Sequence, residues 1–471
     1  MDATDFPPAK RLDTRPWRGT RVPTDLTSAD RGCTRCWRWL LTTAMIVLPL
    51  VTAIGAELFT SIPGAVYDVD KTRDLRLFGI KQDWLIQSSP SLLWQLGFDL
   101  RRQRADYSLH SLVWRDPNDP SEDPLGLYPV ETVGQGEESG TLVSAYSASR
   151  LRLFGPATVE AGLRYDRASH THDSDLSPRL SAMVDLSRGV LLRLGWGQYR
   201  QMHDIHDEIA LNAGGHYDPS ELSTQWTGGI ERVFCGGTAV RVEAYHKHTD
   251  NPRPVYRNWV AGALDVFPET NEDLILARLD ETTERGLETY VSHDTGSRLA
   301  LRGSYAFALA RERLRSVDNI NVPDSPIRFA AENDAARDQR HAVSLDLIWR
   351  PSRVWTINLA LAYHSGWPTT LATTEEIVRA DGQADVAARP EPLYSSRLPA
   401  YQRLDVRFTR RYRSAGGEVR LFLELINLAN RENVFAYDYE KEIAADGTPF
   451  LARESESWFP LLPSIGASCS W

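Results

Sequence analysis

The sequence is poor in cysteine, has no excess of basic charge and contains only one long apolar run. There are four cysteines among 471 residues. Cys33 and Cys36 form a single C-x-x-C without a second pair, so the spacing indicates neither a zinc site nor, without a βαβ context, a redox centre. Cys235 begins a Gly-Gly turn and Cys469 lies in the last expected strand, and neither position implies a disulfide. We therefore expect no cofactor bound through cysteine.

The charge balance and the hydropathy exclude two further classes of protein. The chain has 53 basic and 63 acidic residues, a net charge of −10, which argues against a nucleic-acid partner because nucleic acid favours a basic surface. The mean hydropathy of −0.37 excludes a membrane protein built from many apolar helices. It does not exclude a membrane β-barrel, because half of each barrel strand is polar.

The one long apolar run covers residues 39–56 and follows a basic region. An apolar core behind basic residues and before small ones is typical of a secretory signal peptide. A single signal-anchor helix is the alternative, since the run is just long enough to span a bilayer. A misassigned or interrupted reading frame would also explain it. Residues 1–38, rich in Arg, Asp, Pro and Thr, are predicted to be disordered, and residues 57–72 to be a linker.

The stretch 401–471 shows the pattern that organises the rest of the chain. Leu404, Val406 and Phe408 alternate with polar neighbours, and so do the apolar residues of 419–425. Period-two alternation predicts β-strands with one apolar and one polar face. Such strands suit a barrel wall whose apolar face meets lipid and whose other face lines a wet lumen. At the end of the chain, Ile465, Ala467, Cys469 and Trp471 share the apolar face.

The same unit repeats upstream: strand, short turn, strand, long loop. Beginning at about residue 73, we expect about fifteen antiparallel strands, with short turns at 154–156, 187–189 and 235–237, for example, and long loops between them. This asymmetry is typical of outer-membrane barrels, which have short periplasmic turns and long extracellular loops. A soluble β-sandwich also alternates, but its connections are mostly short. The 14 Trp and 17 Tyr fit aromatic girdles at the two membrane surfaces or an ordinary β-rich core.

The C-terminal stretch resembles the end of TonB-dependent outer-membrane receptors. That family typically finishes with an Asn-rich segment, an "LPxxPSxG" approach and a terminal aromatic residue. Blocks at 162–201, 223–247, 303–308, 338–347 and 359–368 are similar to blocks of the receptor barrels, in the family's order. The matching C-terminal residues here are Asn427, Asn430, Asn433, Leu462, Pro463, Ser464, Gly466 and Trp471.

The resemblance implies a fold, a place and a set of partners. The fold would be an all-β, antiparallel transmembrane barrel covering 73–471, in the outer membrane of a Gram-negative bacterium. Its partners would be outer-membrane lipid, the barrel-assembly machinery and, through a plug domain and its TonB-binding box, the TonB complex. The function would be uptake of a scarce solute such as siderophore-bound iron or cobalamin. The C-terminal assembly signal would comprise Ile465, Ala467, Cys469 and Trp471.

The chain departs from the family in two ways. Transporters of this type have 22 strands, and neither a plug nor a TonB-binding box is found before the first expected strand. An odd number of strands would leave an open edge whose backbone groups lipid cannot satisfy. We therefore expect a partial barrel, the C-terminal part of a longer receptor, that does not perform energised import alone. A plugless passive porin and a surface-binding barrel are the alternatives.

Two histidine-rich loops are the low-ranked candidates for ligand contact. His203, Asp204, His206 and Asp207 lie in one predicted extracellular loop, and a similar cluster around His170 in another. Histidine and carboxylate side chains this close could bind a transition metal or contact a ferric complex. A solvated loop would explain them equally, so no metal site is assigned.

No group of residues suggests an enzyme. Catalysis by a nucleophile needs a base and an orienting group beside it. His341 and Ser344 lie close in sequence, but no nucleophile-elbow motif accompanies them. We expect no catalytic activity.

Overall fold

The computed structural model describes most of the chain from Ala65 onward. Every described residue belongs to the second of two compact units, 63–471. The segments predicted to be disordered (1–38) and signal-like (39–56) lie outside the described residues, as do Asp204, His206, Asp207 and Trp471. Within the described ranges, no helix has the length and apolar character needed to cross a bilayer. These ranges are 65–115, 130–153, 155–187, 189–203, 205, 217–259, 274–294, 296, 298–319, 329–378, 382, 384–414 and 416–470.

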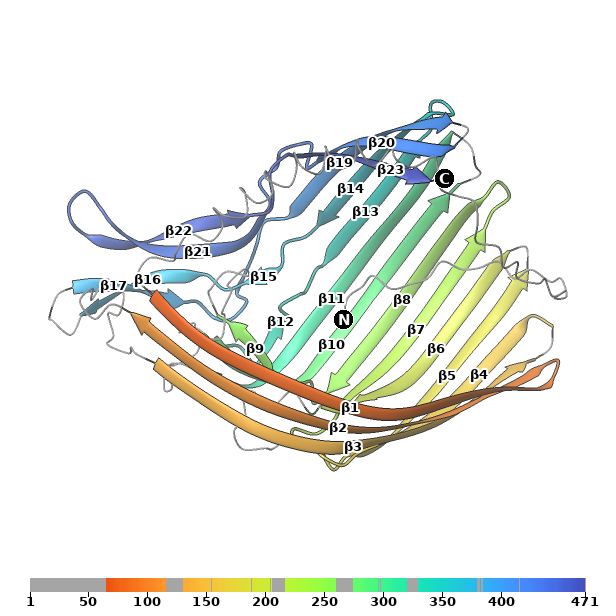
Figure 1. Cartoon of the computed structure of the whole chain (residues 1–471), viewed down its shortest axis with the longest axis horizontal. Helices are drawn as coiled ribbons and strands as arrows, with labels where there is room; N and C mark the ends of the chain where they lie inside the picture. Colours follow the sequence, from red (N-terminus) through yellow and green to blue (C-terminus); the bar gives the residue numbers. More distant parts are fainter. Residues whose placement is uncertain are drawn as a thin grey trace. The chain divides into compact units, whose positions relative to one another are not determined.

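The described residues form one large antiparallel sheet of 17 strands (Figure 1). Setting aside the short β9 and β12, fifteen strands follow one another as a continuous meander, which confirms the predicted all-β antiparallel fold. The first begins at Ala65, so the range 57–72, predicted to be a linker, contains the start of a strand. The fifteen are β1 (Ala65–Ser89), β2 (Leu92–Arg115), β3 (Val130–Arg152), β4 (Ala157–Ala168), β5 (Ser174–Ser187), β6 (Val190–Gln201), β7 (Glu221–Val233), β8 (Thr238–Asp250), β10 (Leu274–His293), β11 (Leu299–Asn319), β13 (His341–Trp349), β14 (Trp355–His364), β19 (Tyr401–Ser414), β20 (Gly417–Ile426) and β23 (Leu462–Ser470).

Short turns lie at one end of the sheet, and the connections at the other end are long, except for the short β4–β5 connection at 169–173. We call these the turn end and the loop end. The loop end carries the remaining strands of the described chain, some as hairpins that project from the sheet (Figure 1). They are β9 (Val255–Asn258), β12 (Glu332–Asp334), β15 (Pro368–Thr369), β16 (Ala372–Val378), β17 (Ala384–Pro390), β18 (Ser396–Arg397), β21 (Val434–Ile443) and β22 (Pro449–Ser457).

The strand register gives the sheet one apolar and one polar face. Leu359 on β14 lies opposite Leu347 on β13 and Val406 on β19. Its neighbour Ala360, on the other face, lies between two aspartates, Asp346 and Asp405. On the apolar face, large apolar side chains are exposed on strand after strand, which is rare on the surface of a soluble monomer. A face of this kind is typical of a barrel wall in contact with lipid. Exposed members include Leu163, Leu180, Leu194, Ile230, Leu287, Leu345, Leu359, Leu361, Leu421, Leu423 and Ile465.

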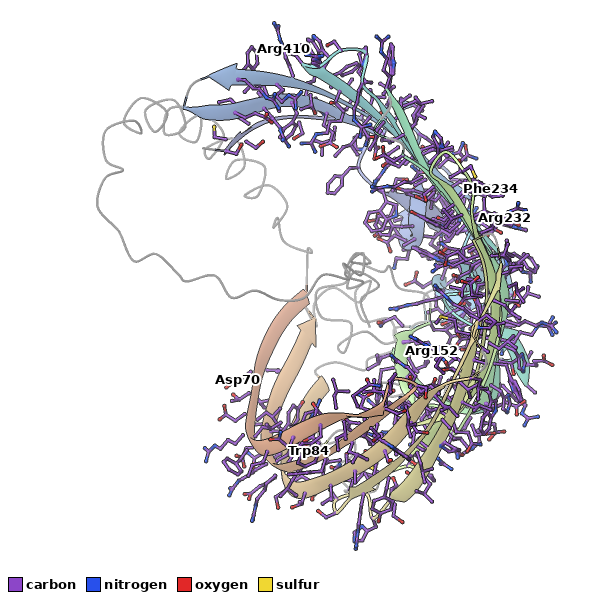
Figure 2. All side chains as sticks on the ribbon, turned by 90° about the vertical axis from the view of Figure 1, so that its right-hand side faces the viewer. Asp70, Trp84, Arg152, Arg232, Phe234 and Arg410 are labelled. Atoms are coloured by element: carbon purple, nitrogen blue, oxygen red, sulfur yellow. The ribbon has the colours of Figure 1, made fainter. Side chains whose placement is uncertain are left out.

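Aromatic residues border this apolar band at both ends. Near the turn end lies Arg410, which is labelled in Figure 2. Its Cζ is 5.4 Å from the centre of the Trp355 ring and 4.9 Å from that of the Tyr412 ring. Trp196 and Trp226 pack 5.9 Å apart toward the loop end. On β14, the chain from Trp355 to its aromatic counterpart Tyr363 extends roughly 26 Å at ~3.3 Å per residue. That length approaches the apolar band of an outer-membrane barrel, about 25 Å tall.

The sheet has two free edges among the described residues. β1 pairs only with β2, and β23 only with β20. Both edge strands run from the loop end to the turn end. The reason is that successive strands of the meander alternate in direction, so the first and the last of fifteen strands run the same way. Direct pairing of the two edges would therefore be parallel, in a sheet whose every other pairing is antiparallel.

The Asn-rich segment after β20 fastens the loop-end connection to the sheet. Asn427 has a positive φ of 53° and is buried, and its amide donates to the carbonyl oxygens of Arg431 and Phe459 at 2.9 and 3.2 Å. Asn433 forms a two-way bond with the backbone of Gln402 on β19, at 2.9 Å in each direction. These asparagines, which carried part of the family resemblance, replace strand pairing where β20 ends.

Candidate functional site

The polar face of the wall is lined with paired charges. Arg164 on β4 donates to Asp166 at 2.8 Å, and Ser144 on β3 donates to the same carboxylate at 2.5 Å. The Tyr146 hydroxyl crosses β2 at Gly97 to reach Asp83 on β1, and a Cβ at Gly97 would meet the Tyr146 ring at 2.5 Å. A glycine is needed there for the tyrosine to pass. This face offers fixed charges to a wet interior.

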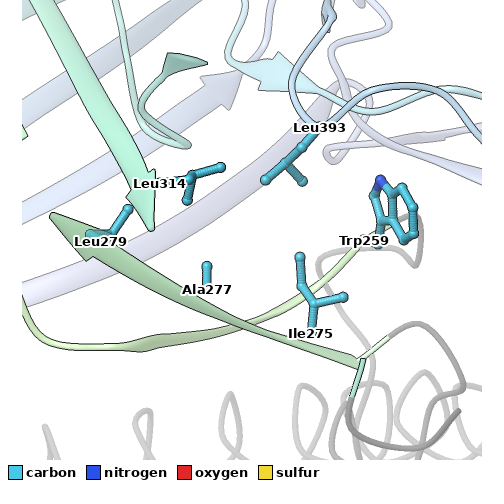
Figure 3. Close-up of a cluster of buried hydrophobic side chains, with 6 residues drawn as sticks. All are labelled: Trp259, Ile275, Ala277, Leu279, Leu314 and Leu393. Carbon is cyan, nitrogen blue, oxygen red and sulfur yellow. The ribbon is translucent and has the colours of Figure 1, made fainter. Parts of the chain in front are cut away.

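The loop end contains a compact apolar core of its own. Leu393, from the connection between β14 and β19, packs with residues of β10 and β11 and with Trp259 (Figure 3). Ile275 is fully buried, and Leu393 is 2% exposed. The full set is Trp259, Ile275, Ala277, Leu279, Leu314 and Leu393. This core, which we call the loop-end core, holds two long connections together.

A buried ion pair lies beside the loop-end core. Arg257 on β9 donates twice to Glu312 on β11, at 2.8 and 3.0 Å. Burial works to lower the pKa of Arg257, but the bonds to Glu312 and the nearby Tyr394 ring outweigh it, so the pKa is raised and the guanidinium stays charged. Burial raises the pKa of Tyr394, which takes a positive φ of 56°. Arg257 lies 5.4 Å from the centre of the Tyr394 ring, so one cation links β9, β11 and the β14–β19 connection.

A second charge cluster ties the β11–β13 connection to the β14–β19 connection. Arg397 on β18 donates to Asp334 and to Asp338, at 2.5 Å each, and to the carbonyl of Gly366 at 3.0 Å. Asp338 is 1% exposed and also accepts from the Ala310 backbone at 2.7 Å. A Cβ at Gly366 would lie 1.6 Å from the Leu398 carbonyl oxygen, so only glycine permits this close approach. Sequence reasoning missed both clusters, because their partners are far apart along the chain and carry no local motif.

The two predicted histidine loops meet in the described part of the chain, where His170 packs against His203. His170 Nε2 donates to the backbone carbonyl of His203 at 2.8 Å, and its ring packs edge-on against Tyr217 at 5.2 Å. His203 is 2% exposed. Asp175, at the start of β5, accepts from Ser220 at 2.7 Å. His170 and His203 are therefore parts of a buried loop contact.

The residues predicted as a C-terminal signal share the apolar face as expected, as far as they are described. Ile465, Ala467 and Cys469 on β23 lie opposite Leu423, Leu421 and Val419 of β20. Ile465 is 73% exposed. Their role in assembly stays a prediction.

Comparison with known proteins gives one family and one fold. A family described as "TonB dependent receptor-like, beta-barrel" matches residues 56–428. No curated protein matches the chain. The solved structures it resembles include the ferric citrate transporter FecA in its unliganded form, with 13% identity, a TM-score of 0.53, and coverage of 87% of this chain and 56% of that one.

Two further receptors give the same result. The ferric yersiniabactin uptake receptor FyuA from Yersinia pestis has 12% identity and a TM-score of 0.52, with coverage of 86% of this chain and 55% of that one. The siderophore receptor PiuA from Acinetobacter baumannii has 11% identity and a TM-score of 0.51, with coverage of 86% and 56%. The chain thus spans about half the length of the receptors it resembles, and identities this low show the fold alone.

Proposed function

The chain belongs to the family of TonB-dependent receptor-like β-barrels, and from this premise we propose that it forms part of the wall of a receptor that takes up a scarce solute. The family's place is the outer membrane of Gram-negative bacteria, and its members are transporters and not enzymes. The observation that carries the proposal is the continuous apolar band on one face of fifteen strands, with charges on the other. A soluble sandwich would bury that band.

The free edges support a partial wall. Fifteen antiparallel strands leave both edges running in one direction. An odd number of further strands is needed before the last edge can pair antiparallel with the first. Family transporters with 22 strands would add seven. We infer that these strands come from sequence outside the described residues or from another polypeptide, and that the described wall does not close alone.

A ferric siderophore, or a solute of similar scarcity such as cobalamin, is the substrate class we propose for the complete receptor. The three receptors above carry ferric citrate, yersiniabactin or siderophore in their names, and the fold likeness supports the same class here. The loop-end core and its charge clusters lie where such a solute would enter. Asp204, His206 and Asp207 lie in the loop that begins at His203, and we propose that they contact the solute. Energised import would further require a plug and its contact with the TonB complex.

An uptake experiment tests this function. The chain is expressed in the outer membrane of cells that lack their own siderophore receptors, and entry of radiolabelled ferric siderophore is followed with and without a protonophore. We expect no energy-dependent uptake by this chain alone. Restored uptake that the protonophore abolishes would refute the partial wall. Uptake that rises linearly with solute concentration and is unaffected by the protonophore would favour the passive porin.

A second measurement tests the membrane placement by itself. The purified chain should require detergent or lipid to stay dispersed, and its folded form should migrate differently from its heated form on a denaturing gel. A well-folded monomer in detergent-free buffer would overturn the lipid-facing band and, with it, the proposed function.

A further inference from the structure

Three metal-binding side chains converge on the outward face of β8 and β10. They are His248 and Asp250 from β8 and Glu281 from β10, and one donor atom of each lies within 4.8 Å of the others. We propose that they form a binding site for a divalent first-row transition metal such as Zn²⁺. One imidazole and two carboxylates are a donor set that suits such ions and leaves a position open for water.

The distances between the donor atoms approach those of a bound metal. His248 Nε2 lies 3.3 Å from Asp250 Oδ1 and 3.8 Å from Glu281 Oε2. A tetrahedral Zn²⁺ with ligands at about 2.1 Å holds its donor atoms about 3.4 Å apart. The two distances from His248 are thus within a few tenths of an ångström of this value, and the two carboxylate donors, within 4.8 Å of each other, can approach it by side-chain rotation.

The imidazole is already oriented by a group outside the ligand set. His248 Nδ1 and the Thr283 hydroxyl are 3.1 Å apart, and the two residues lie opposite each other on β8 and β10. A bond at one ring nitrogen is the usual way in which a metal-binding histidine is aimed. With Nδ1 held by Thr283, Nε2 points to the two carboxylates.

The surrounding charges favour a cation at this point. Asp250 and Glu281 are direct cross-strand partners, and like charges placed opposite each other destabilise a sheet. Arg313 on β11 partly offsets the repulsion through a contact of 3.2 Å with Glu281. A metal bound by both carboxylates would offset it more fully, in competition with Arg313.

The position in the wall gives the site a structural consequence. His246, one step closer to the membrane on the same face of β8, lies opposite Trp226 of the aromatic border and opposite Arg285. The proposed metal thus lies just beyond the apolar band, where β8 and β10 leave the bilayer. Bound there, it would clip the two strands together ahead of the long connection that separates them in sequence.

Zinc binding to the full chain folded in detergent tests the proposal. Zn²⁺ is titrated against a chromophoric chelator, with folding of each variant checked by its heat-dependent gel migration. We expect one site per chain, an affinity at least tenfold lower in His248→Gln and in Glu281→Gln, and no change in the control His246→Gln. Equal affinity in wild type and His248→Gln would overturn the site, and so would several weak sites in place of one.

Two further variants separate a built site from general loss of structure. Arg313→Gln should bind Zn²⁺ several-fold more tightly, because the competing cation is gone. Thr283→Val should bind it about tenfold more weakly and should change the visible spectrum of bound Co²⁺, since the ring loses its orientation. Weaker binding in Arg313→Gln would contradict the proposal, because it would mean that this arginine supports the fold and does not compete for the carboxylate.

Discussion

The wall and the loop end of this molecule use apolar side chains in opposite ways. On the wall, Leu345, Leu359 and Leu361 are 37–38% exposed on the outer face. In the loop-end core, Ile275 and Leu393 are between fully buried and 2% exposed. The wall relies on lipid to remove its apolar face from water, whereas the loop end removes it by packing within the chain.

The ion pairs of the two regions also differ in solvent exposure. On the wall, the pair of Arg150 on β3 and Glu160 on β4 is 2.7 Å apart, with side chains 56% and 34% exposed, so water screens it and its contribution is small. Arg257 and Glu312 form a pair of similar length with side chains only 13% and 2% exposed. Removing one partner there leaves a charge without water. The loop end is therefore stabilised by burial within the chain, as in an ordinary globular domain, whereas the wall depends on lipid. Substitutions can test each region separately.

The largest expected effect comes from breaking the buried pair. Glu312→Ala should destabilise the loop end by about 3–5 kcal/mol, because Arg257 would keep its charge without a partner. Hydrogen exchange of β9 and limited proteolysis near Leu393 should both rise, while the heat-dependent gel migration that reports the wall stays as in wild type. Glu160→Ala, which breaks the exposed pair on the wall, is the control, and equal effects of the two variants would remove the distinction between the regions.

The next effect concerns the wall alone. Leu345→Arg should cost about 2–4 kcal/mol of folding stability in lipid bilayers, since it places a charge in the apolar band. Ser344→Arg changes the adjacent residue, which points to the charged face, and should be nearly neutral. Urea unfolding in bilayers measures both. If the lumen-side variant were the more damaging one, the assignment of the two faces would be reversed.

A smaller effect is expected where the two regions join. Asn427→Ala should cost about 1–3 kcal/mol, because buried backbone groups lose their hydrogen-bond partners. Asn430→Ala is milder, as that side chain accepts one bond, from the Leu461 backbone at 2.9 Å. Proteolysis of the β20–β23 connection should increase in that order, and a reversed order would show that the Asn427 contacts are dispensable.

The smallest effect is a dependence on alkaline pH. Burial raises the pKa of Tyr394, so its contribution to stability is present below the ordinary tyrosine pKa of about 10 and is lost as pH rises through the higher folded value. Absorbance of tyrosinate in wild type minus Tyr394→Phe should show one group that ionises above pH ~10 together with opening of the loop-end core. Ionisation of this group below pH 10 would contradict its burial.

The sequence predicted the wall far better than the loop end. The period-two pattern around Leu404 and Val406 follows directly from backbone geometry, so it gave the strands, their two faces and the alternation of short and long connections. The hairpins β16–β17 and β21–β22 were not predicted, because their exposed strands lack a clear apolar face. Arg257 and Glu312 are 55 residues apart, and nothing local marks them as partners.

The candidate ligands show the same limit. His203 was predicted to lie in an exposed loop, because a polar neighbourhood indicates solvent when only the sequence is considered. It is buried because a neighbouring connection, through His170, folds against it. The donors His248, Asp250 and Glu281 were missed, because β9 and a long connection separate the two strands that bring them together.

The common direction of β1 and β23 restricts how copies of this chain can associate. Any two copies inserted by the same machinery have their turn ends on the same side of the membrane. The four edge strands of the two copies then run in the same direction. No two of them can pair antiparallel unless one copy is inverted across the bilayer. Joining identical sheets therefore cannot close a barrel by antiparallel pairing alone. The strands that complete it must differ in topology from this chain.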